Sequence, residues 1–340
     1  MKIDIGFALF GAGLLLAAPT VFSEQLEIGA GSQAGEYTGT LVPAIDKKLR
    51  GHGYSAVAKI SEGSQQNIEE VLAGTLKVSL SQWDVAALAM GEDTTGKLVL
   101  LGNMAPEALL CAGHKEGRVK SYADLTDAHD RPLTVSVGGE RSGTARTFAY
   151  LSKIDKRLGG LEYVYNPNIA EELRRLSSKN RDAVCFVMMP NPDNELIGQV
   201  AKDESLRFFG IDNPQFAQVK INGKQIYDIV EVPVSPGVWG IGADTVTTLV
   251  TGVGLVINSE LVDLGLSVIL KSVMQDPELL PPGTTAGKAQ ALYDKYSVKA
   301  AELGTTALEK TKEYHSIAVE KTSEAMEKTD KYIEEVRNEH

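Results

Sequence analysis

The feature that most constrains this chain is a regular alternation of strand-like and helix-like segments, which begins at residue 26. Short apolar, β-branched runs are each followed by a segment whose apolar residues recur at helical spacing. The strand-like runs cover residues 26–28, 54–60 and 78–80, and the helix-like segments cover residues 37–49, 65–72 and 85–90. Because parallel strands need a crossover between them, the alternation predicts an α/β fold with helices on both faces of a sheet.

A second alternating series begins near Pro132 and predicts a second lobe with a sheet of its own. Its strand-like runs cover residues 133–137, 162–165 and 183–188, and its helix-like segments cover residues 144–154 and 169–177. Other strand-like runs break this rhythm, because no helix separates them; they cover residues 98–101, 108–111, 225–232 and 247–257. We interpret them as hinge strands that carry the chain between the two lobes and make the first lobe discontinuous.

The expected division of the chain follows from these hinge strands. We expect lobe 1 to contain residues 24–118 and 226–284, and lobe 2 to contain residues 119–225. After Pro281 and Pro282 the pattern changes, and residues 288–336 contain no Pro and one Gly, with apolar residues at steps of three, four or seven. Residues 285–340 are therefore expected to form a long amphipathic helical extension. The favoured interpretation is a solvated helix packed along a lobe. The alternatives are a coiled-coil or partner-docking helix, which would allow self-association, and a helix that binds a membrane surface.

The N-terminal segment resembles a cleaved export signal. Lys2 precedes an apolar run from Ile5 to Ala18, which is shorter than the ~20 residues needed to cross a bilayer. Small or branched residues follow, and we expect cleavage near Ser23, which would place the mature protein in the periplasm. A buried first strand or helix and an uncleaved anchor are the alternatives.

Charge and residue usage exclude several function classes. The 34 Lys and Arg residues face 45 Asp and Glu residues, for a formal net charge of −11, which disfavours a nucleic-acid partner. The five histidines are scattered and pair with no evident nucleophile, so we expect no enzyme, no metal and no cofactor. Cys111 and Cys185 could form one disulfide, but each lies in an apolar strand-like run, and two separate buried thiols are favoured.

Three predicted strand-to-helix junctions share one composition of Gly and small hydroxyl residues. They cover residues 29–35, 61–64 and 138–144, the last in the second lobe. The unpaired N–H groups of a first helical turn and the positive end of the helix dipole favour an anion at such a junction. Each junction taken alone is a plain helix N-cap, but three across two lobes indicate a carboxylate-bearing ligand. The residues assigned to it are Ser32 and Gly35 on one side and Ser142, Gly143 and Thr144 on the other.

Residues 82–84 end the third predicted strand and add further candidates. Gln82 and Trp83 are expected to face the crevice between the lobes, whereas Asp84 fits an N-cap better than a ligand contact. Arg141 and Arg146 flank the second-lobe junction, where either could pair a ligand carboxylate. Surface solvation or a salt bridge with Glu140 is the alternative.

Several of these segments together resemble the TAXI family, the periplasmic solute receptors of TRAP transporters. The resemblance covers residues 26–275 and is most specific over residues 28–37, 62–67, 72–74 and 80–84, with a looser match at 142–144, 182–186 and 236–239. It implies a two-lobed type II periplasmic-binding-protein fold with a hinge. It also implies a ligand such as glutamate or a dicarboxylate, and a TRAP-type membrane permease as partner. The positions that it carries over are Ser32, Gly35, Tyr37, Gly63, Ser64, Gln82, Asp84 and Ser142 to Thr144.

The sequence therefore predicts a receptor that captures a small carboxylate-bearing solute between two lobes and delivers it to a permease. In such a clamshell, contacts from both lobes exist only in the closed form, so the ligand shifts the equilibrium toward closure. The alternative is a sensor or interaction protein that has the same fold and recruits a partner through its helical tail.

Overall fold

The computed structural model describes residues 24–221, 223–235, 244–276, 278–281 and 287–291. The strands are β1 (Glu24–Gly29), β2 (Tyr54–Lys59), β3 (Val78–Gln82), β4 (Leu98–His114), β5 (Thr134–Ser136), β6 (Glu162–Val164), β7 (Ala183–Met188), β8 (Leu206–Gly210), β9 (Lys220–Ile221), β10 (Lys224–Gln225), β11 (Asp228–Pro233) and β12 (Thr245–Asn258). The α-helices are α1 (Val42–Leu49), α2 (Ser64–Leu72), α3 (Trp83–Glu92), α4 (Tyr122–Thr126), α5 (Gly143–Ile154), α6 (Ile169–Ser177), α7 (Glu195–Lys202), α8 (Pro214–Gln218) and α9 (Leu264–Gln275). Three short helices of other types are η1 (Tyr37–Leu41), η2 (Arg50–His52) and η3 (Lys156–Gly160).

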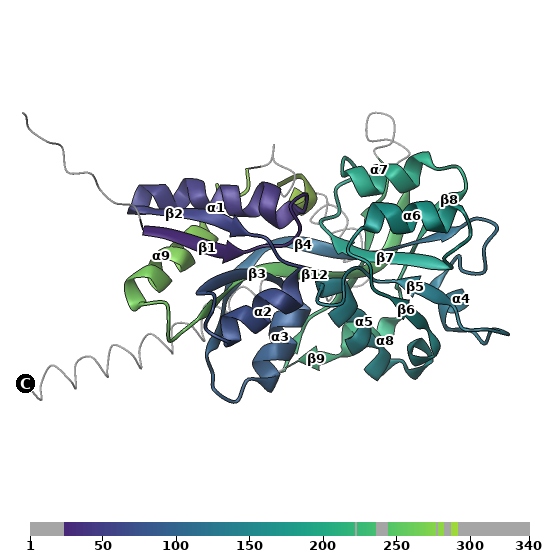
Figure 1. Cartoon of the computed structure of the whole chain (residues 1–340), viewed down its shortest axis with the longest axis horizontal. Coiled ribbons are helices and arrows are strands. Elements are labelled where there is room, and N and C mark those ends of the chain that lie inside the picture. The colour runs from purple at the N-terminus through teal and green to yellow at the C-terminus, as the bar shows by residue number, and fades with distance from the viewer. Residues whose placement is uncertain (1–23, 222, 236–243, 277, 282–286, 292–340) are drawn as a thin grey trace, which may run out of the picture.

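One sheet of ten strands runs through the whole body, in the order β2-β1-β3-β12-β4-β7-β5-β6, with β11 added on β12 and β8 on β4 (Figure 1). The β1·β2, β1·β3, β5·β6 and β5·β7 pairs are parallel, as their helical crossovers require. The pairs made by β4 and β12 are antiparallel. The expectation of a separate sheet in each lobe is therefore wrong, because the two long strands pair with each other and join both halves.

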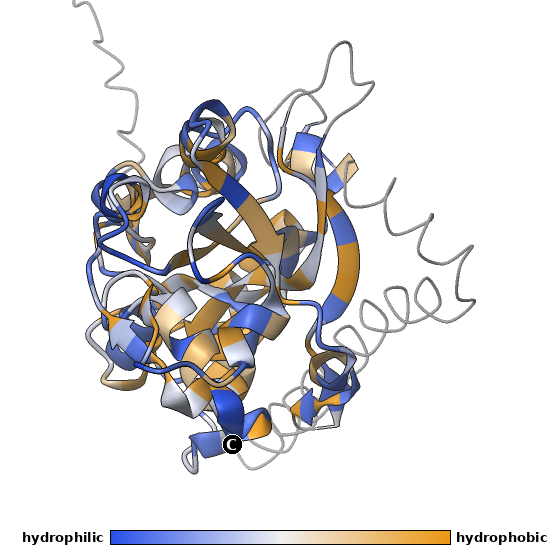
Figure 2. Cartoon of the chain, turned by 90° about the vertical axis from the view of Figure 1, so that its right-hand side faces the viewer, coloured by the Kyte–Doolittle hydropathy of each residue, from blue (hydrophilic) through white to orange (hydrophobic). Residues whose placement is uncertain are grey.

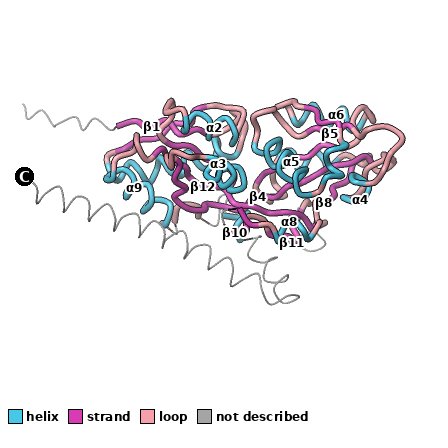
Figure 3. The backbone as a smooth tube through the Cα atoms, turned by 90° about the horizontal axis from the view of Figure 1, so that it is seen from below, coloured by secondary structure: helices cyan, strands magenta, loops and turns pink. Residues whose placement is uncertain are grey.

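Strands β4 and β12 connect two lobes, which stand apart as two groups of elements in Figure 3. Lobe 1 is built around β1 to β3 with α1, α2, α3 and α9, and lobe 2 around β5 to β8 with α4 to α8. β4 is 17 residues long and β12 is 14, and each contributes buried side chains to the cores of both lobes. The prediction that hinge strands join the two lobes is confirmed. The two runs predicted at 98–101 and 108–111 are parts of one continuous strand, β4.

The cores follow from the apolar periodicity of the chain. In lobe 1, Leu26 and Ile28 of β1 pack with Ile45 of α1, Leu80 of β3 and Leu270 of α9. Figure 2 shows the central strands largely in the hydrophobic colour, with hydrophilic residues on the helices around them. The expected α/β class with two lobes and hinge strands is confirmed.

A disulfide joins Cys111 on β4 to Cys185 on β7 in lobe 2, with 4.1 Å between their Cα atoms. The expectation of two separate thiols is therefore wrong. The two residues are direct cross-strand partners in the antiparallel β4·β7 pair, a neighbourhood that the local sequence of either run does not reveal.

Some predictions fall on residues outside the described part of the chain. These are the export signal at residues 1–23, the segment at 236–239 and most of the helical extension at 285–340. The division of the chain at residues 118/119 and 225/226 stays a prediction. Within the described residues, none of the helices has the length and apolar character required to cross a membrane.

Candidate functional site

The N-termini of two helices from opposite lobes meet at the line between the lobes. α2 of lobe 1 begins after its N-cap Gly63, and α5 of lobe 2 begins after its N-cap Ser142. A Cβ added at Gly63 would lie 3.4 Å from the Cα of Ser142, and the backbone N–H of Gln66 donates to the carbonyl of Arg141 at 3.2 Å. Gly63 has a φ of 127°, which favours glycine. Two positive dipole ends therefore converge, an arrangement that an anion stabilises.

Gln82, the last residue of β3, lies between these two helix ends and is only 4% exposed. Its backbone N–H donates to the hydroxyl of Ser64 at 3.0 Å, and a Cβ added at Gly143 would overlap its side-chain amide. The Nε2 atom of Gln82 is buried and has no hydrogen-bond partner among the described residues. Gln82, Ser64 and Gly143, all predicted from the sequence, thus come together and leave one donor unused.

Tyr37 extends this polar group toward the hinge. Its hydroxyl donates to the Oε2 atom of Glu107 at 2.9 Å. Glu107 lies in the middle of β4 and is 3% exposed, and burial raises the pKa of its carboxyl well above its ordinary value. Burial, together with the Glu107 carboxylate, also raises the pKa of Tyr37 well above 10.

Asp84 is fully buried in the first turn of α3 and links the lobes. Its Oδ2 atom accepts hydrogen bonds from the hydroxyls of Thr147 on α5 at 2.5 Å and Tyr227 at 2.7 Å. Burial raises the pKa of Asp84 in spite of these donors, which act in the opposite direction. The N-cap of α3 is Gln82, so the favoured reading of Asp84 as an N-cap is wrong.

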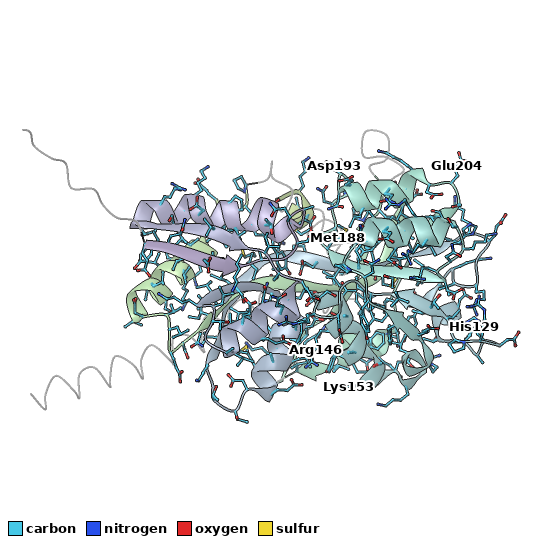
Figure 4. All side chains as sticks on the ribbon, in the orientation of Figure 1. His129, Arg146, Lys153, Met188, Asp193 and Glu204 are labelled. Carbon is cyan, nitrogen blue, oxygen red and sulfur yellow. A yellow bond between two sulfur atoms is a disulfide. The ribbon has the colours of Figure 1, made fainter. Side chains whose placement is uncertain are left out.

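Glu36 is a residue of this region that the sequence analysis missed. It precedes η1 in lobe 1, and its carboxylate accepts hydrogen bonds from the backbone N–H of Met189 at 2.9 Å and from Nδ2 of Asn194 at 3.1 Å, both in lobe 2. Burial raises the pKa of Glu36 to about 7. Figure 4 labels the neighbouring Met188 and Asp193 along the line where the lobes meet. The sequence feature that could have pointed to Glu36 is its position directly after the Gly-rich junction.

The predicted hydroxyls of lobe 2 are already used inside that lobe. The Ser142 hydroxyl accepts from the N–H of Ala145 at 3.1 Å, as an N-cap does, and the Thr144 hydroxyl accepts from the N–H of Val187 at 3.0 Å. Thr144 nevertheless lies in the α5 turn that faces lobe 1. Its role at a ligand stays a prediction.

The first junction does not reach across the lobes in this structure. The carbonyl of exposed Ser32 accepts from the N–H of Gly35 and the hydroxyl of Thr38, each at 2.9 Å. Among the described residues, no hydrogen bond joins Ser32 or Gly35 to lobe 2. Trp83 packs at the start of α3, where a Cβ added at Gly254 of β12 would lie 2.8 Å from its indole nitrogen.

Both candidate arginines form ion pairs between the lobes. The guanidinium of Arg141 lies 2.5 Å from the carboxylate of Glu69 on α2, and that of Arg146 lies 3.0 Å from Glu92 on α3. Figure 4 shows Arg146 at the lower side of the line between the lobes. Both arginines therefore form salt bridges, but with Glu69 and Glu92 across the line between the lobes and not with the expected Glu140.

Metal binding finds no support in the described part of the chain, where no group of three or more His, Cys, Asp or Glu residues could hold an ion. The candidate site consists of hydrogen-bond donors from two lobes around the buried carboxyls of Asp84 and Glu107.

Comparison with solved structures gives matches of low similarity. The chain is 13% identical to AbpA of Streptococcus pneumoniae, the substrate-binding protein of an amino acid ABC transporter, bound to L-arginine; the match covers 80% of this chain and 93% of that one, with a TM-score of 0.44. An ArgBP mutant from T. maritima is 14% identical over 81% and 95% of the chains, with a TM-score of 0.44. The GluR0 ligand-binding core in complex with L-glutamate is 12% identical over 76% and 94%, with a TM-score of 0.45.

The family comparison covers most of the sequence. The pattern that defines the NMT1-like family matches residues 28–303, which include both lobes and every candidate site residue. The chain therefore belongs to the NMT1-like family.

Proposed function

We propose that the protein is an exported solute-binding receptor that closes two lobes around a small carboxylate-bearing solute. The observation that carries the proposal is the meeting of the α2 and α5 N-termini with the unused Nε2 donor of Gln82 between them. A carboxylate placed there would accept from backbone N–H groups of both lobes and from this amide. Such charge-assisted hydrogen bonds exist only when the lobes are closed, so the solute would stabilise the closed form.

A carboxylate of the protein itself supports the preference for an anion at this place. The Oε2 atom of Glu62, in the loop before α2, lies 3.4 Å from the backbone nitrogen of Arg141 in the loop before α5. The two loops thus already attract negative charge from one lobe to the other.

More specifically, we propose that the protein is a TAXI-type receptor that serves a TRAP-type permease from the periplasm. Its solute would be an amino acid such as glutamate or a dicarboxylate. It is supported by the junction residues of the first lobe and by residues 80–84, which resemble that family.

Thermal melting against a panel of amino acids and dicarboxylates tests the proposal. A solute present at 100 times its Kd stabilises the folded state by ~2.7 kcal/mol, which raises the melting temperature by about 5 °C or more. No shift with any member of the panel would favour the interaction-protein alternative. Ser142→Ala is a poor test variant, because it removes the N-cap of α5 as well.

Gln82→Met is the sharper variant, because it removes the amide and keeps the length of the side chain. We expect a loss of about 10- to 100-fold in affinity for the solute that the panel identifies, the value of a hydrogen bond to a charged group. Gln33→Met, in the exposed first junction, is the matched control and should keep full affinity. Equal affinity in both variants would refute the assigned site.

A further inference from the structure

Three carboxyl groups come together where the lobes close, and two of them are almost free of solvent. Asp84 is 0% exposed and Glu107 is 3% exposed. Glu36 is half-buried, and its carboxylate is covered by the hydrogen bonds from Met189 and Asn194. They come from three segments of lobe 1 and the hinge: the start of η1, the start of α3 and the middle of β4.

The partners of these carboxyls are neutral donors. Tyr37 donates to Glu107, while Thr147 and Tyr227 donate to Asp84. One further polar group lies on the same strip. Thr251, the cross-strand partner of Glu107 on β12, has a buried hydroxyl with no hydrogen-bond partner among the described residues.

The charged groups that act on the three carboxyls are mostly one another. Glu36 and Asp84 both raise the pKa of Glu107, and Asp84 also acts on Tyr37 and on Tyr150 of α5. At the rim beside Asn194, the cation Lys288 is already paired with Asp193 at 3.0 Å. Among the described residues, no Lys, Arg or His side chain shifts the pKa values of the three carboxyls.

Burying an ionised carboxyl without a cation costs more free energy than burying it protonated. The hydrogen bonds from Met189 and Asn194 to Glu36 exist only while the lobes touch, so separation would return this carboxyl to water. We propose that closure of the lobes is coupled to proton uptake by Glu36, so that the closed form is favoured at acidic pH. The inference rests on the proposed function in one respect, that the lobes separate and close.

The direction and size of the expected pH effect on closure follow from Glu36, whose pKa rises from its ordinary 4.5 to about 7 on burial. Below pH 4.5 the group is protonated in both forms, and its burial carries no ionisation cost. Between pH 4.5 and 7 the closed form holds a proton that the open form has lost, so closure weakens about tenfold per pH unit. From pH 5 to pH 7 the ratio of closed to open molecules should fall about 40-fold through Glu36.

Single-molecule FRET on the ligand-free full chain tests the proposal, with dyes on cysteines introduced at exposed Ser272 of α9 and Lys202 of α7. The closed population should rise as the pH falls from 7 to 5. The Glu36→Gln variant should close more readily at pH 7 and should lose the 40-fold change in the closed-to-open ratio between pH 5 and pH 7. The control variant Glu162→Gln, at an exposed position of β6, should keep this change.

A closed-to-open ratio that changes less than threefold from pH 7 to pH 5 in the unsubstituted protein would overturn the proposal, without need of any variant. A full response in Glu36→Gln would overturn the role of that residue. The outcome is separate from the solute panel. If the closed-to-open ratio depends on pH but no solute raises the melting temperature, the receptor function is refuted and proton-coupled closure stands. If a solute raises the melting temperature but the ratio does not depend on pH, proton-coupled closure is refuted and the receptor function stands.

Discussion

Gly143→Ala should act as a wedge between the lobes, because of where Gly143 lies. It is the first residue of α5, and a Cβ added to it would overlap the side-chain amide of Gln82 in the other lobe and lie 3.0 Å from the hydroxyl of Ser64. Its φ is not positive, so alanine fits the backbone of lobe 2 without strain.

The expected magnitude has two parts of opposite sign. Within lobe 2, alanine in place of glycine in a helix stabilises by roughly 0.5–1 kcal/mol. In the closed form, one extra methyl group in a packed interface costs about 1–3 kcal/mol, because Gln82 is buried and has little room to move. Closure, and any solute affinity that depends on it, should therefore weaken by about 5- to 150-fold.

The FRET ratio of closed to open molecules measures the cost to closure, and the melting temperature measures the effect on the stability of the fold. Gly198→Ala on α7 is the matched control, because nothing lies within 4 Å of a Cβ added there. Both variants should melt at or above the temperature of the unsubstituted protein, and Gly143→Ala should populate the open form. An unchanged FRET ratio and unchanged solute affinity in Gly143→Ala would refute the assignment of this contact to closure.

Three further predictions concern stability and the contacts between the lobes. Reducing the Cys111–Cys185 disulfide, which spans a sequence separation of 74, should lower the free energy of unfolding by up to about 4.4 kcal/mol, measured by urea unfolding with and without reductant; equal midpoints would contradict the cross-link. Tyr227→Phe removes a donor to a buried carboxylate and should cost about 1.5–3 kcal/mol in the same assay, whereas a neutral result would mean that water replaces the phenol. Arg141→Ala removes an ion pair that is about 40% exposed, and should cost less than about 1 kcal/mol of closure in the FRET assay.

Sequence patterns predicted the local elements well where apolar residues repeat strongly. α6 at Ile169–Ser177 and β7 at Ala183–Met188 have the expected bounds. Here the helical and strand periodicities differ clearly, and Asn168 supplies a side-chain N-cap to α6.

Pairings between distant segments were not predictable in the same way. Nothing in the sequence of β4 states that it pairs with β12, more than a hundred residues later, or that Cys111 lies opposite Cys185. The joining of both halves into one sheet and the disulfide were missed for this single reason.

The sequence predicted several residues of the candidate site, but it missed two of the carboxyl groups that lie there. The junctions at Gly63 and Gly143 do face each other, because glycine permits two helix ends to approach closely. Glu107 was not found, since a single acid in an apolar run belongs to no motif. Glu36 was not found either, because its importance comes from its hydrogen bonds to Met189 and Asn194 of the other lobe, which its own segment does not reveal.

The shared strands have a consequence for how the molecule unfolds and how it moves. Since β4 and β12 supply apolar side chains to both cores, a fragment that ends between the lobes would expose strand edges and half of a core. We expect the two halves to melt in one cooperative transition and to resist expression as independent pieces. Opening would then be an elastic bending of two paired strands, concentrated where their register shifts on either side of Gly254, with the ladder of hydrogen bonds kept intact.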